Sequence, residues 1–343
     1  MKKKTVFVHI GTHKTGSTSL QVSLRKSKKY LNSQGLNYLE TDWSYDLMKK
    51  NELDTEVLEH IRKAFLKQVS QCPQNNNIII SAEKFSGDPY TGYSNAMTLA
   101  SSLKLITEGF DVKLLVYLRR QDSFIESLYS QSIHQGAHWS FNEFMQTRPS
   151  QLFDWNKLIL SFELEFGESQ VNVRSYDYFR EASDTSLHQD FFEFLGVTDL
   201  TKIYQGKKDT NISYSAAALG FARRVNKYIE PSLQKAFRYG LQKSNSSKRP
   251  KLFLTSNQRA DVLRTLHSSN QVIAKRKLNK AEALCLLKEP LIQADNEMSH
   301  KDKFEELEEI VARYIAYNEI RPSAEPREIL RSFYYKYFLK NKT

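Results

Sequence analysis

The sequence predicts an α/β protein in which helices cover both faces of a mostly parallel sheet. Short apolar runs of the kind that form buried strands, such as 112–118, alternate with stretches whose apolar residues recur at helical spacing. Strands and helices that alternate in this way build parallel sheets through right-handed crossovers. The 343 residues are also enough to bury a core that needs no disulfides.

Composition narrows the class of protein. Hydrophobic residues make up 40% and charged residues 26% of the chain, as in ordinary globular proteins. No apolar run approaches the roughly 18 residues that a membrane span needs. Two cysteines cannot form a disulfide framework, so we expect a reducing, cytoplasmic location. The net charge of +11 favours anionic ligands, but zinc-finger spacing and RNA-binding aromatic signatures are absent, and we expect no nucleic-acid partner.

The first 30 residues predict a phosphate-binding unit. An apolar run at 6–10 predicts a buried strand, Gly11 ends it, and a helix is predicted over 17–30. Loop N–H groups and the positive end of a helix attract anions, and Lys14 adds a full charge. Ser17 or Thr18 could cap this helix.

The rest of the core follows the same alternation. Helices are predicted at 52–69, 96–106, 123–135 and 190–195, strands at 78–81, 112–118 and 171–176, and a turn at 34–37. In such sheets ligands lie beyond the carboxyl ends of the strands. The loops that follow the strands ending at Ile10, Ser81 and Leu118 should therefore converge on one crevice.

Beyond about residue 200 helical periodicity dominates. We predict an α/β core over 1–225 and a helical extension over 226–343 that packs on it, with a flexible loop at 243–250. The segment 332–343 mixes aromatic residues and lysines, which suits either a docked terminal helix or peripheral contact with a membrane.

The loop sequence identifies a family resemblance. A Walker A loop needs Lys directly after its second Gly, but here Lys14 precedes Gly16. The run Lys14-Thr15-Gly16-Ser17-Thr18 instead resembles the loop of sulfotransferases that binds the 5′-phosphosulfate of PAPS (3′-phosphoadenosine-5′-phosphosulfate). The segment 118–131, with Arg119 and Ser127 eight residues apart, resembles the family's 3′-phosphate site. It departs from many members at Arg120-Gln121, where they have Asp-Pro or Asn-Pro.

The resemblance implies a P-loop-like, three-layer fold with about five parallel strands, and a bacterial enzyme that sulfates carbohydrate. It implies a metal-independent, in-line transfer of a sulfuryl group from PAPS, with PAP as the product. Lys14 would neutralise the leaving oxygen. The residues implied in holding PAPS are Thr12, His13, Lys14, Thr15, Gly16, Ser17, Thr18, Arg119 and Ser127, with Lys207 and Lys208 in a covering loop.

A general base must take the proton of the acceptor hydroxyl. Glu83 directly follows the strand at 78–81 and is the first candidate, Glu40 is the alternative, and His13 in the loop is a third. The alternative interpretation of either glutamate is a solvated surface carboxylate with no catalytic role. The acceptor, whether polysaccharide, lipopolysaccharide or glycolipid, is left open, as is the oligomeric state.

Two other functions stay open. A P-loop nucleotide kinase or NTPase would require Mg²⁺, and the displaced Lys14 and the Arg119 and Ser127 pair count against it. A non-catalytic basic module that binds glycans or the inner face of the membrane would fit the net charge, but it leaves the first loop unexplained.

Overall fold

The computed structural model describes residues 3–44, 47, 55–181, 185–204, 214–244 and 253–289. These residues form two compact units that interleave along the chain. The first unit takes its described residues from 3–125, 148–204 and 258–289, and the second from 126–147, 214–244 and 253–257. The predicted division at residue 225 stays a prediction, because much of 226–343 and of the loop 243–250 lies outside the described residues.

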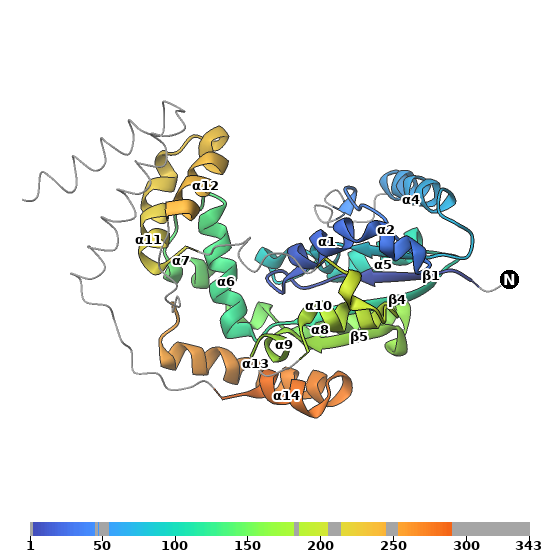
Figure 1. Ribbon diagram of the computed structural model, residues 1–343. Coiled ribbons are helices and arrows are strands. Elements are labelled where there is room, and N and C mark those ends of the chain that lie inside the picture. Colours follow the sequence, from blue (N-terminus) through green and yellow to red (C-terminus); the bar gives the residue numbers. More distant parts are fainter. Residues whose placement is uncertain are drawn as a thin grey trace, which may run out of the picture. The chain divides into compact units, whose positions relative to one another are not determined.

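The first unit contains a five-stranded sheet in which every strand pair is parallel, and this confirms the predicted fold class (Figure 1). The strand order is β2-β3-β1-β4-β5. The strands are β1 (Thr5–His9), β2 (Leu36–Tyr38), β3 (Asn77–Ser81), β4 (Asp111–Leu118) and β5 (Val171–Ser175). In the centre of the sheet Val6 of β1 pairs with Ile78 of β3 and with Val112 of β4.

Strand β2 lies where the sequence predicted only a turn. Its three residues are too few to give a periodic signal, and a turn with Gly35 at φ 76° precedes it. The Asn77 N–H donates to the Gly35 carbonyl at 2.8 Å, which starts the pairing of β2 with β3.

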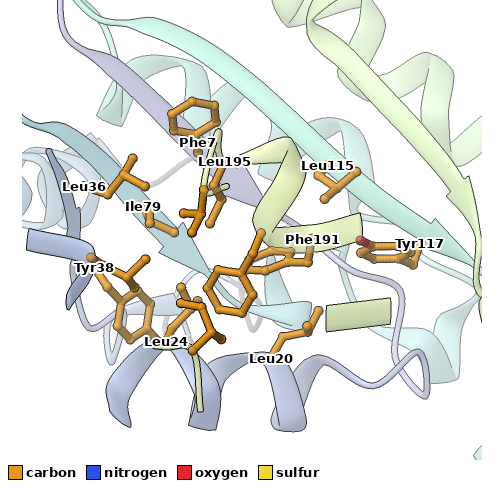
Figure 2. Close-up of a cluster of buried hydrophobic side chains, with 14 residues drawn as sticks. Phe7, Leu20, Leu24, Leu36, Tyr38, Ile79, Leu115, Tyr117, Phe191 and Leu195 are labelled. Carbon is orange, nitrogen blue, oxygen red and sulfur yellow. The ribbon is translucent and has the colours of Figure 1, made fainter. Parts of the chain in front are cut away.

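One face of the sheet is covered by α1 (Ser17–Lys26), α2 (Lys28–Ser33) and α10 (Leu187–Phe194). Figure 2 shows Leu20 and Leu24 of α1 near Phe191 of α10, in one cluster with the strand residues Ile79 and Leu115. The single helix predicted over 17–30 is divided at Ser27, whose hydroxyl accepts a hydrogen bond from the Tyr204 N–H at 2.9 Å.

The opposite face carries α4 (Thr55–Ser70), α5 (Ala96–Ile106) and α8 (Trp155–Phe166). The chain runs one way along the sheet from β1 to β2 and the other way from β2 through β3 and β4 to β5. Right-handed crossovers therefore place the two sets of helices on opposite faces, and α5 packs against both α4 and α8.

Three helices complete the first unit near β5. These are α9 (Tyr176–Glu181), α13 (Ser256–Lys277) and α14 (Lys280–Leu287), and α14 packs on α9 and β5. The Glu282 side chain accepts hydrogen bonds from the N–H groups of Ser175 and Asn279, and in this way it joins the start of α14 to the end of β5.

The second unit is helical. It contains most of α6 (Gln121–His134), together with α7 (Phe141–Thr147), α11 (Ala216–Val225) and α12 (Gln234–Ser244). The rings of Tyr129, Phe141, Phe144 and Phe253 contact one another, and Glu126 accepts hydrogen bonds from the N–H groups of Phe253 and Leu254. The boundary between the units falls inside α6, after Ile125.

Candidate active site

The topology of the sheet opens a crevice between β1 and β3. These strands are neighbours, but the chain leaves β1 toward α1 on one face and leaves β3 toward α5 on the other. The loops after β1, β3 and β4 meet there, as the sequence predicted. The Thr12 hydroxyl donates to the Tyr117 carbonyl at 2.8 Å, and the His13 N–H donates to the Tyr93 hydroxyl at 3.2 Å.

The loop before α1 has the backbone of an anion-binding turn. Lys14 and Gly16 have φ angles of 67° and 83°, both in the left-handed region, and the Thr15 hydroxyl donates to the Thr12 carbonyl at 2.5 Å. Gly16 is the N-cap of α1, and no side chain caps the helix. The expected cap by Ser17 or Thr18 is therefore wrong. Because the first N–H groups of a helix lack partners within it, this end of α1 can bind an anion.

Two cations lie together at this loop. Lys14 and Arg119 are both half-buried, and the Arg119 guanidinium donates from Nη1 to the Lys14 carbonyl at 3.2 Å. No carboxylate in the described ranges lies within 4 Å of either cation. Burial and the charge of Arg119 lower the pKa of Lys14, and burial lowers the pKa of Arg119. The charges of Asp177 and Glu83 act on Arg119 and Lys14 from beyond 4 Å, and neither cation forms an ion pair with a carboxylate of the described residues.

Polar atoms also face Gly11 at the start of the loop. A Cβ on Gly11 would lie 2.7 Å from the Ser17 Oγ and 3.0 Å from the His9 Nε2. Both of these atoms are buried, and neither has a hydrogen-bond partner among the described residues. His9 Nδ1 is 2.8 Å from the Ser81 hydroxyl, and burial lowers the pKa of His9 to about 4, so its imidazole is neutral at pH 7.

Both glutamates considered as the base line one cavity of 230 Å³ beside the ends of β2 and β3. Glu83 is half-buried and accepts a hydrogen bond from the Gln21 Nε2 at 3.0 Å, while Glu40 is exposed. The cavity adjoins the helix that follows the loop, because Gln21 of α1 also lines it. From the sequence, Glu83 and Glu40 are alternative candidates for the general base, and in the structure both line the same cavity.

His13, the third candidate, is buried behind the loop. Burial lowers its pKa to about 4, and Nδ1 lies 3.5 Å from the Tyr93 hydroxyl. Tyr93 has a φ of 61°, a rare conformation for a bulky residue, and is completely surrounded. It positions the loop from the segment after β3. Nothing in the sequence singles it out, because this contact joins residues 80 positions apart.

A second set of missed residues supports Arg119. The Trp155 indole N–H donates to the Arg119 carbonyl at 2.8 Å, and Arg119 Nε donates to the Ser123 hydroxyl at 2.9 Å. Arg120 and Gln121, which depart from the family pattern, bind other parts of the unit. Arg120 donates to the Asp122 carboxylate, and the Gln121 amide forms reciprocal hydrogen bonds with the Asn270 amide on α13.

The donor-binding roles of all the residues named from the sequence stay predictions. Ser127 is half-buried in α6 and belongs to the second unit, whereas Arg119 belongs to the first. Lys207 and Lys208 lie outside the described residues. Thr18, by contrast, is exposed in the first turn of α1, beside the loop.

No protein-family model matches the chain. An uncharacterized protein of Archaeoglobus fulgidus is 28% identical over 163 residues, which are 46% of this chain and 44% of that protein, so the match spans less than half of the relative. The crystal structure of a sulfotransferase from Alicyclobacillus acidocaldarius aligns with a TM-score of 0.41 at 12% identity, covering 76% of this chain and 94% of that one.

The described residues contain no group of three or more His, Cys, Asp or Glu side chains arranged to hold a metal ion. None of the helices in the described ranges is long and apolar enough to cross a membrane.

Proposed function

We propose that this protein is a sulfotransferase that transfers the sulfuryl group of PAPS to a hydroxyl of a carbohydrate. The observation that carries the proposal is the pair of half-buried, unpaired cations, Lys14 and Arg119, at the uncapped start of α1. Buried charge is costly unless it is paired, so such a site favours a ligand with several negative charges. The loop sequence Lys14-Thr15-Gly16-Ser17-Thr18 favours PAPS over a nucleoside triphosphate.

The residues present suit this donor. The N–H groups at the start of α1 would hold the 5′-phosphosulfate, and the Ser17 hydroxyl, which is buried without a partner, would donate to it. Gly11 leaves this space open, since a Cβ there would contact Ser17 and His9. Arg119 offers a planar fork to a phosphate. Ser127, Lys207 and Lys208 belong to the proposal as further phosphate ligands.

PAPS supplies an activated sulfuryl group, and the protein supplies position and charge. The acceptor oxygen forms a bond to sulfur while the bond from sulfur to the phosphate oxygen breaks, and PAP leaves with the electron pair. Lys14 would balance the charge that develops on the leaving oxygen. Glu83 would take the acceptor proton, because it lines the cavity beside the loop and Gln21 orients one of its oxygens. Glu40 is the alternative base in the same cavity.

The test is a thermal shift with PAP and, separately, with ATP and Mg²⁺. A ligand at about 100 times its Kd stabilises the folded state by roughly 2.7 kcal/mol. We expect PAP without metal to stabilise the wild type and to stabilise Lys14→Ala much less. Lys63→Ala, which removes an exposed lysine on α4, should respond like the wild type. Stabilisation by ATP and Mg²⁺ alone would replace this proposal with a kinase or NTPase.

A further inference from the structure

The cavity beside the anion-binding loop has a charge opposite to that of the whole chain. The chain carries a net charge of +11, but three carboxylates, Glu40, Asp42 and Glu83, line this cavity against two cations, Arg25 and Lys84. The side chains of Glu40 and Asp42 are exposed to it, and no cation of the described residues lies within 4 Å of either carboxylate. These two carboxylates are therefore available to a ligand.

A buried tyrosine also borders the cavity. Tyr38 is only 3% exposed, and its ring packs in the apolar cluster of Figure 2 near Leu24. Among the residues that the structure describes, its hydroxyl has no hydrogen-bond partner, although it borders the cavity. Burial and then the charge of Glu40 raise the pKa of Tyr38 to about 12, so the hydroxyl stays protonated at pH 7.

These groups suit one kind of ligand. Carboxylates accept hydrogen bonds from hydroxyl and ammonium groups, and a phenol both donates and accepts. A ligand carboxylate or sulfate would bring like charge close to Glu40 and Asp42. Unfavourable charge of this kind discriminates between ligands that are otherwise alike.

We propose that this cavity binds a sugar unit that carries no negative charge, either neutral or amine-bearing, and that it rejects uronate and sulfated units. The proposal rests on the proposed function, because this sugar unit would be the acceptor whose hydroxyl faces Glu83. The basic surface of the chain would by itself suggest an acidic polysaccharide. The lining of the cavity assigns the opposite preference at the place where the acceptor hydroxyl reacts.

The test is ligand-observed NMR on the full chain with PAP present, using methyl glucoside, methyl glucosaminide and methyl glucuronide as matched probes. We expect the first two sugars to bind at least tenfold more tightly than the glucuronide. Asp42→Asn should reduce the difference in Kd between the glucuronide and the other two sugars. Asp261→Asn is the matched control, because Asp261 pairs with Arg264 on the exposed surface of α13 and does not line the cavity.

The outcomes separate the two proposals. Equal or tighter binding of the glucuronide, binding of none of the three sugars, or an unchanged preference in Asp42→Asn would each overturn the inference. If PAP stabilises the protein while one of these results is found, the sulfotransferase proposal stands without it. If PAP fails to stabilise the protein but the sugar preference is found, the cavity is a sugar site and the donor is wrong.

Discussion

Asp122 gives the sharpest test of how the candidate site is held together. Its side chain is fully buried between two guanidinium groups. Arg120 donates to both of its oxygens at 2.8 Å, and Arg259 of α13 donates to Oδ2 at 2.7 Å. Burial alone would raise the pKa of Asp122, but the hydrogen bonds and charges of Arg120 and Arg259 lower it below its usual value.

The perturbation is Asp122→Asn, which keeps the shape of the side chain and removes its charge. Removal of one partner from a buried ion pair costs about 3–5 kcal/mol, because the other charge is left without compensation. Asp122→Asn leaves the guanidinium groups of both Arg120 and Arg259 without the Asp122 carboxylate. Since whole proteins are stable by only about 5–15 kcal/mol, the variant should unfold at a much lower urea concentration than the wild type.

The assay is urea unfolding at pH 7, with Asp261→Asn as the control. Asp261 pairs with Arg264 where both side chains are mostly exposed, and such a pair contributes about 0–1 kcal/mol. Because the pKa of Asp122 is lowered on folding, its contribution is complete above the unfolded pKa near 3.9 and disappears as the pH falls through the folded pKa. A cost for Asp122→Asn within about 1 kcal/mol of the control would refute the reasoning.

Three other predictions follow from the site. Gly11→Ala should destabilise the protein by about 2–5 kcal/mol through backbone strain and overpacking. The control Gly109→Ala, at φ 96° with open space around the Cβ, should lose only the stability that the strain costs. Equal losses of stability in the two variants would contradict the close packing at Gly11. Because burial lowers the pKa of His9 and of His13 from 6.5 to about 4, stability measured by urea unfolding should be complete above pH 6.5 and fall toward pH 4; replacing either histidine with Asn should flatten this slope, and an unchanged slope counts against their burial. Arg119→Lys keeps the charge but loses the hydrogen bond to the Lys14 carbonyl and the planar fork for a phosphate, so PAP should bind about tenfold more weakly by calorimetry. Unchanged affinity would remove Arg119 from the site.

The sequence predicts the layered part of the fold well because local patterns specify it. The strand at 78–81 is an unbroken apolar run, and a parallel strand buried on both faces needs such a run. The helix predicted over 52–69 begins and ends within three residues of α4, since its buried residues recur every three or four positions. Strand β2 carries neither signal, and it became a strand only because β3 supplies its hydrogen bonds.

The candidate site likewise contains residues that local sequence patterns predict and residues that they do not. Lys14 and Arg119 could be predicted because Lys14 lies in the loop after one recognisable strand and Arg119 directly follows another. Their support could not, because it comes from distant segments. Asp122 is paired with Arg259, Gln121 with Asn270, and neither pair has a periodic or compositional signature at separations of 137 and 149 residues.

The interleaving of the two units has a consequence for biosynthesis. Synthesis adds about 5–20 residues per second. The stretch from residue 125 to residue 258, where the last part of the first unit begins, therefore takes on the order of ten seconds. During that interval the nascent chain has β4 but lacks β5 for part of the time, and Asp122 has no Arg259. The edge of β4 is then open to other chains. The protein should therefore depend on chaperones that hold nascent chains until α13 emerges.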